Sequence, residues 1–522
     1  MTVAVNPVLP GCYPDPSVCR VGEWYYLVCS TFEYLPGLPV MRSRDLVRWQ
    51  TVGHVVDRDG MLDLDGIASS GGLYAATIRH GHGRFWVVCT LVDQHDEGRG
   101  GSFLVTADDA GGPWSAPVML DVDGIDPSIA FDDDGRIWLH GTRLAREPEW
   151  PEQTEVWVRE YSPSAAALVG EEHVVWRGAV RGAVWAEGPH LYRIDGRWYL
   201  LAAEGGTSFH HAVAVARADD VRGPYEGSPA NPVFTHRHLG RGVDVIGTGH
   251  ADLVQAPDGS WWALMLAMRT SDGEHHPLGR ETFLCPVTWE NGWPVFAQGE
   301  GRLPRERELP WDADDPPPHS WQPDDARAGE IPPHDPRWTS VRTIPGEVAR
   351  VVDGSWLLPV RETTLRDATA PAFLGVRQQH RRVDVRCGLD LTQLARGESA
   401  GLVVRQSERD HVFAAVARRD GRLHARLVHR RAGVEHELAR TVLPDADGVE
   451  LGLRVRDDDY AFLVGERALG SVDGRTLDSA ATGGFLGLWI GVHATSDGAE
   501  AVGAVRIARF SYAPAGGAGA AR

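Results

Sequence analysis

The chain has 522 residues, of which 43% are hydrophobic, and it contains 60 glycines and 34 prolines. This length exceeds what one hydrophobic core usually serves, so two or three domains are expected. All 52 cationic residues are arginines, and the net charge of −20 argues against nucleic acid as a partner, because docking on phosphates needs clustered cations. No stretch approaches the roughly 20 apolar residues of a membrane span.

The first residues and the cysteines bear on the cellular compartment. Residues 1–7 lack the basic segment and apolar core of a signal peptide, so we expect a cytoplasmic protein. The cysteines are scattered without paired metal-ligand spacing, and a cytosolic chain keeps thiols reduced. We therefore expect free, mostly buried thiols at Cys12, Cys19, Cys29, Cys89, Cys285 and Cys387.

One short pattern recurs five times within residues 1–309: a glycine followed, two and three residues later, by a bulky apolar or aromatic pair. The copies begin at Gly22, Gly83, Gly135, Gly196 and Gly259, at spacings of 61, 52, 61 and 63 residues. A turn glycine leading into an aromatic-rich strand is typical of a β-hairpin, and its recurrence indicates a repeat architecture. Since a four-stranded blade takes roughly 40 to 50 residues, we predict a five-bladed β-propeller with long loops on one face.

The residues that precede these turns by seven or nine positions occupy equivalent positions in the five repeats, and we call this position the structural address. They are, in chain order, Asp15, Tyr74, Asp126, Glu187 and His250. In propellers the first strand of each blade lines the central channel, so residues just before that strand converge at the channel mouth. The repeat therefore places three carboxylates in one central pocket.

Each candidate also has a structural interpretation. Asp15 lies between two prolines, where turn aspartates are common, and Glu187 could be a paired structural glutamate. His250 could be a metal ligand, a hydrogen-bonding anchor or a buried core histidine. Asp126 repeats the Asp-Pro-Ser tripeptide of residues 15–17 at the equivalent address, and this registration favours a functional role for all three carboxylates.

Three gathered carboxyl groups suit one kind of chemistry. Hydrolysis of a glycosidic bond with inversion needs one carboxylic acid to protonate the leaving oxygen and one carboxylate to deprotonate a water on the opposite sugar face. The two groups lie roughly 6.5 to 9.5 Å apart so that the water fits between them. A third carboxylate near the acid would raise the pKa of that acid by charge repulsion.

The composition changes after residue 309. Residues 310–337 are rich in Pro and Asp without any period, which is typical of a linker. Residues 338–512 return to alternating strand patterns, such as residues 400–405, and predict an all-β sandwich. The Gly- and Ala-rich tail, residues 513–522, is expected to be disordered.

Seven motifs, taken in order along both domains, point to a family. They are residues 6–17 (NPVLPGCYPDPS), 30–34 (STFEY), 186–190 (AEGPH), 204–207 (EGGT), 278–284 (LGRETFL), 371–380 (PAFLGVRQQH) and 397–402 (GESAGL). Together they closely resemble glycoside hydrolase family 43, most of all its two-domain β-xylosidases. The resemblance covers essentially the whole chain and implies a five-bladed propeller followed by a concanavalin-like β-sandwich.

The resemblance also implies an activity. It is that of an exo-acting β-xylosidase of xylan degradation, which removes β-1,4-linked xylose from the non-reducing end of xylooligosaccharides by single-displacement inversion. Asp15 would be the general base, Glu187 the general acid, and Asp126 the residue that tunes and orients the acid. No cofactor would be required for this chemistry.

The same resemblance implies the substrate-binding residues. Arg280 would hydrogen-bond the terminal sugar, Phe32 would supply an apolar wall, and Phe485 of the sandwich would close the pocket into an exo-acting shape. His250 would lie at the pocket floor, beside a structural calcium ion or a water. The subgroup further implies a homo-oligomer, either a dimer or a tetramer.

Three positions depart from the family pattern. Tyr74 stands where the family has a sugar-contacting tryptophan, Ala76 replaces a proline, and Cys12 replaces an aromatic residue. Because tyrosine keeps a flat face and adds a hydroxyl, we expect the chain to be catalytically active. The sequence does not decide which sugar it prefers. The alternatives are an α-L-arabinofuranosidase or a bifunctional enzyme and, from another class, a non-catalytic sugar-binding propeller.

Overall fold

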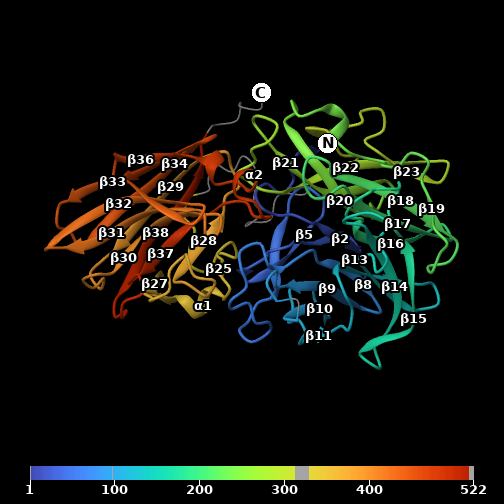
Figure 1. The fold of residues 1–522 in the computed structure, drawn as a ribbon, viewed down its shortest axis with the longest axis horizontal. Helices are drawn as coiled ribbons and strands as arrows, with labels where there is room; N and C mark the ends of the chain where they lie inside the picture. Colours follow the sequence, from blue (N-terminus) through green and yellow to red (C-terminus); the bar gives the residue numbers. More distant parts are fainter. Residues whose placement is uncertain (1, 97, 312–328, 516–522) are drawn as a thin grey trace.

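The computed structural model describes residues 2–96, 98–311 and 329–515. It has two bodies of β-structure, a propeller drawn from blue to yellow-green and a sandwich drawn from orange to red (Figure 1). The predicted all-β fold of a five-bladed propeller followed by a sandwich is confirmed. Within the described residues no helix is long and apolar enough to cross a membrane.

Each blade is an antiparallel sheet whose strands follow chain order outward from the centre. Blade one contains β2 (Ser17–Val21), β3 (Trp24–Val28), β5 (Gly37–Ser43) and β6 (Gln50–Val56). Blade two contains β8 (Thr77–Gly81), β9 (Arg84–Val92), β10 (Gly100–Ala107) and β11 (Val118–Met119), with β7 (Gly72–Leu73) also paired to β9. Blade three contains β12 (Ile125–Phe131), β13 (Ile137–Leu144), β14 (Thr154–Ser162) and β15 (Ala167–Trp176).

The last two blades repeat this plan. Blade four contains β16 (Glu187–Ile194), β17 (Arg197–Glu204), β18 (Ala212–Ala218) and β19 (Glu226–Gly227). Blade five contains β20 (Val245–Gln255), β21 (Trp261–Arg269), β22 (Glu281–Glu290) and β23 (Trp293–Phe296). In all five blades the repeat glycine lies in the turn between the first and second strands. The first strands contact one another in a ring, so the residues at their start face one centre.

The aromatic pair of each repeat recurs because adjacent blades pack through it. In blade three, Ile137 packs in a core cluster with Trp86 of blade two, while the next residue, Trp138, packs with Trp198 of blade four. Successive side chains of a strand point to opposite faces of its sheet. Two consecutive bulky residues therefore fill the gaps on both sides of a blade.

The N-terminal segment before blade one joins blade one to blade five. Strand β1 (Val3–Val5) pairs with β24 (Glu306–Glu308), and Leu9 forms a β-bridge with Thr282 of blade five. Between β1 and Leu9, the side-chain amide of Asn6 donates to the Leu284 carbonyl at 2.8 Å. The segment before blade one is thus attached to blade five, a contact that the repeat pattern did not predict.

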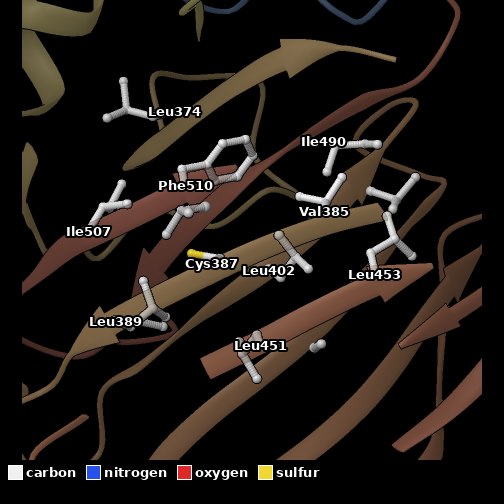
Figure 2. Packing of buried hydrophobic residues seen from close by; sticks show 14 of the residues in the cluster. Leu374, Val385, Cys387, Leu389, Leu402, Leu451, Leu453, Ile490, Ile507 and Phe510 are labelled. Carbon is white, nitrogen blue, oxygen red and sulfur yellow. The ribbon is translucent and has the colours of Figure 1, made fainter. Parts of the chain in front are cut away.

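The sandwich consists of two antiparallel sheets. The seven-stranded sheet runs in the order β26 (Arg350–Val352), β27 (Ser355–Pro359), β38 (Ala504–Pro514), β29 (Arg382–Asp390), β34 (Gly448–Arg456), β35 (Asp459–Val464) and β36 (Arg467–Asp473). The six-stranded sheet runs in the order β28 (Phe373–Arg377), β37 (Trp489–Thr495), β30 (Ser399–Arg405), β31 (His411–Arg419), β32 (Arg422–Arg431) and β33 (Val434–Leu443). Every second residue of β29 is buried, namely Val383, Val385, Cys387 and Leu389. Figure 2 shows part of this row with Leu402 and Ile490 of the opposite sheet.

The two domains share a buried polar interface. Strand β4 (Tyr34–Leu35) of the propeller pairs with β25 (Ser340–Val341), which precedes the sandwich. Arg405 of the sandwich donates to Glu33 at 3.0 Å and to the Tyr34 hydroxyl at 2.6 Å, and Arg405 and Glu33 are almost fully buried. Tyr34 also stacks on Trp489, with ring centroids 3.8 Å apart. The sandwich is therefore fixed against blade one.

Some predicted features lie outside the described residues. These include residues 312–328 of the predicted linker and residues 516–522 of the predicted disordered tail. In the part of the predicted linker that the structure describes, Ile331 is buried in the sandwich core and its N–H donates to the carbonyl oxygen of Phe510. All six cysteines are free and buried, as predicted.

Candidate active site

The structure brings Asp15, Asp126 and Glu187 together at the start of the innermost strands of blades one, three and four. Asp15 precedes β2, Asp126 is the second residue of β12, and Glu187 is the first residue of β16. The two aspartates influence the pKa of Glu187 through charge repulsion, so all three groups lie within electrostatic range. Tyr74 and His250, the other residues at this address, also interact electrostatically with Asp15.

The backbone at this address is locally irregular. Asp15, Asp126 and His250 have φ angles of 54°, 52° and 48°, in the left-handed region that non-glycine residues rarely adopt. Strands β12, β16 and β20 shift register with their partners at the same place. Bulges of this kind re-aim a side chain, and here they coincide with the carboxylates and the histidine.

Asp15 is held as a carboxylate. Ser30 donates its hydroxyl to Oδ2 at 2.6 Å, Arg280 donates from Nη1 to Oδ1 at 3.0 Å, and Nδ1 of His250 lies 3.8 Å from Oδ1. Burial by itself would raise the pKa of Asp15, but Arg280, His250 and Ser30 together outweigh it and lower the pKa below its ordinary value. The group is therefore ionised at neutral pH.

Asp126 accepts a hydrogen bond from the backbone next to Glu187. The N–H of Gly188 donates to Asp126 Oδ2 at 3.0 Å. Gly188 has a φ of 56°, and a Cβ at this position would lie 2.8 Å from the ring of His250, so only glycine fits. Burial, with a further contribution from Asp15, raises the pKa of Asp126 to about 6, although His250 and the Gly188 N–H oppose the rise.

Glu187 is held in the opposite protonation state. It is half-buried, and burial is the largest cause that raises its pKa well above the ordinary value. Repulsion from Asp126 and then from Asp15 adds to the rise, and Arg280 opposes it. A protonated Glu187 thus lies near an ionised Asp15, which is the pairing that an acid and a base require.

Aromatic side chains from three separate segments surround Arg280. Its guanidinium carbon lies 5.5 Å from the ring centre of Phe32 and 5.3 Å from that of Phe485. Tyr74 contacts both rings edge-on, at 5.7 Å from Phe32 and 5.8 Å from Phe485. Phe485 comes from the sandwich, in the loop between α2 (Ser479–Thr482) and β37. The site is therefore built by both domains.

Three polar residues of the site were missed by the reasoning from repeats. Besides Ser30, these are Thr207, whose hydroxyl accepts from Arg280 at 3.0 Å, and Gln94, whose amide nitrogen lies 2.8 Å from the Tyr74 hydroxyl. Ser30 and Thr207 belong to motifs quoted above, which was their only signal. Gln94 lies in a loop after β9, and nothing in the sequence marks it.

The surroundings of His250 do not form a cage for calcium. Calcium in proteins takes six to eight oxygen ligands. Beside His250 lie the ring of His190, at 6.2 Å, and the Asp15 carboxylate, which already accepts from Arg280 and Ser30. No group of three or more His, Cys, Asp or Glu side chains able to hold a metal ion occurs in residues 2–96, 98–311 and 329–515. An ion here would be held mainly by water, so no reaction step is assigned to it.

Comparison with known proteins shows what the two domains of the chain are similar to. The model "Glycosyl hydrolases family 43" matches residues 4–294, and "Beta xylosidase C-terminal Concanavalin A-like domain" matches residues 331–513. A xylosidase/arabinosidase of Butyrivibrio fibrisolvens is 37% identical over 520 residues, which cover 95% of this chain and 97% of the relative. A non-reducing end α-L-arabinofuranosidase of Bacteroides ovatus is 34% identical over 518 residues, covering 94% and 91%. The solved structure of a xylan β-1,4-xylosidase from Bacillus halodurans has a TM-score of 0.87 at 29% identity, covering 98% of this chain and all of that one.

Proposed function

The chain belongs to glycosyl hydrolase family 43, an inverting family, and we propose that it is an exo-acting β-xylosidase that removes β-1,4-linked xylose from the non-reducing end of xylooligosaccharides. The observation that carries this proposal is the opposed ionisation of two neighbouring groups. Asp15 has a lowered pKa and Glu187 a raised one, in a site that Phe485 borders from the second domain.

In this proposal two side chains exchange protons with the reactants. The Asp15 carboxylate takes a proton from a water molecule as the water oxygen attacks the anomeric carbon. The bond between that carbon and the leaving oxygen breaks, and Glu187 gives its proton to the leaving oxygen. Because water enters opposite the leaving group, the anomeric configuration inverts. Burial and then charge repulsion from Asp126 keep Glu187 protonated, and Asp126 also holds the adjoining backbone through Gly188.

Arg280 and the aromatic residues would bind the terminal sugar. A guanidinium stays charged and presents several N–H donors in a fixed plane, which suits the gripping of hydroxyl groups. Phe32 offers an apolar face beside it, and Phe485 would limit the length of chain that can enter. A site closed in this way would favour cleavage at the chain end.

The second candidate is an α-L-arabinofuranosidase, or an enzyme with both activities. It is favoured by Tyr74, which stands where the family has a tryptophan, and by the relatives named for arabinosidase or arabinofuranosidase activity. Rates on 4-nitrophenyl β-D-xyloside and 4-nitrophenyl α-L-arabinofuranoside compare the two candidates directly. The non-catalytic alternative is set aside, because the chain is a member of a family of inverting glycosidases.

The stereochemistry of the product tests the proposal. Proton NMR of 4-nitrophenyl β-D-xyloside hydrolysis should show α-xylose as the first-formed sugar, with β-xylose appearing later through mutarotation. First-formed β-xylose would contradict single displacement. Release of xylobiose or longer products from xylohexaose, ahead of xylose, would contradict the exo-acting assignment.

Two finer predictions from the sequence are carried as proposals. These are a cytoplasmic location and a homo-oligomer. Light scattering coupled to size-exclusion chromatography measures the oligomeric state, and a monomer would contradict the second. The structural calcium ion predicted near His250 is not proposed again, because the described residues around His250 do not supply the oxygen ligands that calcium takes.

A further inference from the structure

Gln94 holds the hydroxyl of Tyr74 in one orientation. Its side-chain nitrogen lies 3.0 Å from the carbonyl oxygen of Ser70 and 2.8 Å from the Tyr74 hydroxyl. Since a carbonyl oxygen only accepts, Gln94 must direct its NH₂ group, and not its oxygen, toward Ser70. The second hydrogen of the same NH₂ then donates to the phenolic oxygen.

This orientation leaves the proton of Tyr74 available as a donor. The phenolic oxygen already accepts from Gln94, so its own O–H points elsewhere. Burial raises the pKa of Tyr74 to about 12, so the phenol keeps that proton at neutral pH. The group also interacts electrostatically with Arg280, Asp126 and Asp15, which places it among the charges of the site. A fixed O–H donor therefore lies in a wall that Phe32 and Phe485 otherwise make apolar.

Ser70, which accepts from Gln94, also contacts the second domain. Ser70, whose carbonyl accepts from Gln94, also accepts at its hydroxyl from the backbone N–H of Phe485, at 2.9 Å. The two loops approach closely here, because a Cβ on Gly484 would lie 2.4 Å from the Ser70 hydroxyl oxygen. Ser70 thus contacts both Gln94 and the loop that carries Phe485. These contacts hold the Tyr74 hydroxyl in place before a ligand binds.

The candidate sugars differ at the one group that such a donor could select. An α-L-arabinofuranosyl unit carries C5 outside the ring, with a free primary hydroxyl. A β-D-xylopyranosyl unit has C5 inside the ring and no such hydroxyl. A site built to hydrogen-bond a hydroxyl discriminates against the sugar that lacks it.

We propose that Gln94 is a positioning residue that orients the Tyr74 hydroxyl toward the primary hydroxyl of a terminal arabinofuranosyl unit, and that it thereby sets the balance between arabinofuranosides and xylosides. The inference rests on the proposed function, which it deepens by naming a determinant of sugar preference. Gln94 acts through Tyr74 and does not itself touch the reacting atoms.

The test measures kcat and KM of the full-length enzyme on 4-nitrophenyl α-L-arabinofuranoside and 4-nitrophenyl β-D-xyloside. In Gln94→Glu the side chain keeps its size, but an ionised carboxylate accepts the Tyr74 proton instead of donating to the oxygen. We expect kcat/KM on the arabinofuranoside to fall about three- to ten-fold, mainly through KM, because one hydrogen bond to the sugar is lost. The xyloside should change less, so the ratio of the two kcat/KM values should drop.

Further variants separate a positioning role from a structural one. Gln94→Ala and Tyr74→Phe should each lower the ratio, and the double variant should lower it no further, because both changes remove the same bond. Gln298→Ala is the matched control, since Gln298 is also an exposed glutamine bonded to neighbouring side chains, after the outermost strand of blade five. Its ratio should equal that of the unmodified enzyme. Thermal unfolding of each variant checks that the fold is retained.

The outcomes distinguish this inference from the proposed function. Equal losses on both sugars, or an unchanged ratio in Gln94→Glu, would overturn the inference and leave the β-xylosidase proposal intact. Hydrolysis of the xyloside but not of the arabinofuranoside by the unmodified enzyme would overturn it as well. Hydrolysis of neither sugar would defeat the proposed function itself.

Discussion

Asp15 and Glu187 show how two carboxyl groups in one site acquire opposite roles. Burial acts on both in the same direction, toward a higher pKa. Arg280, His250 and Ser30 together reverse this effect at Asp15, whereas Glu187 has two aspartates nearby, which strengthen it. The neighbours, and not the residue types, therefore decide which group is suited to act as an acid and which as a base.

Substitution of each group should separate these roles by leaving group. Glu187→Ala should lose most activity on xylobiose but retain more on 2,4-dinitrophenyl xyloside, because a good leaving group departs without protonation. Asp15→Ala should be inactive on both substrates, since water still has to be activated. Steady-state rates on the two substrates provide the comparison, and the same pattern of loss in both variants would overturn the assignment.

The charge of Asp126 should be visible in the pH dependence of kcat/KM. The free enzyme needs Asp15 ionised and Glu187 protonated, so activity should fall at acidic pH through the lowered pKa of Asp15 and at alkaline pH through the raised pKa of Glu187. Asp126→Asn removes a negative charge that raises the pKa of Glu187, so the alkaline limb should move to lower pH. Asp133→Asn, on an exposed turn, should leave the profile unchanged, and an alkaline limb that stays in place in Asp126→Asn would contradict the tuning role.

Among the structural elements, the blades were predictable and the loops between them were not. The spacing of the repeat glycines located all five hairpins, because a turn glycine and a pair of bulky residues are what blade packing demands of every copy. The same register predicted which residues meet at the centre. Gln94 was not predictable, because its contact with Tyr74 depends on the path of the loop between β9 and β10, which the repeat pattern does not specify. The pairing of β1 with β24 also lacks any local pattern.

The interface between blade one and the sandwich rests on a buried ion pair, and this leads to a prediction on stability. Arg405→Ala would leave Glu33 buried without its partner, which costs about 3–5 kcal/mol of unfolding free energy. Arg396→Ala, which removes an exposed arginine 4.0 Å from Asp420, should change stability by less than about 0.5 kcal/mol. Urea denaturation followed by tryptophan fluorescence measures both variants. Equally small losses would show that the interface does not depend on Arg405.

At the scale of the whole molecule, residues of both domains border the candidate active site. The propeller contributes the proposed acid and base, and the sandwich contributes Phe485 and part of the interface between the domains. His250, in β20 of the propeller, lies beside Asp15, and its surroundings suit a hydrogen-bonding role better than calcium coordination.

Removal of divalent ions tests that interpretation. Exhaustive dialysis against EDTA should leave kcat and KM on 4-nitrophenyl xyloside essentially unchanged, because the ionised form of Asp15 is maintained by Arg280 and Ser30. Enzyme dialysed without chelator is the control. If EDTA instead lowers the activity, if added Ca²⁺ restores it, and if Ca²⁺ no longer does so in His250→Ala, an ion binds at this position.

The attachment of the first residues to blade five has a consequence for biosynthesis. Asp15 obtains its arginine from residue 280, and the strand just upstream of it pairs with residues 306–308. Phe485 emerges from the ribosome later still. A polypeptide translated only as far as blade one would therefore hold the proposed general base without its arginine partner, and we expect hydrolysis only after both Arg280 and Phe485 have been added.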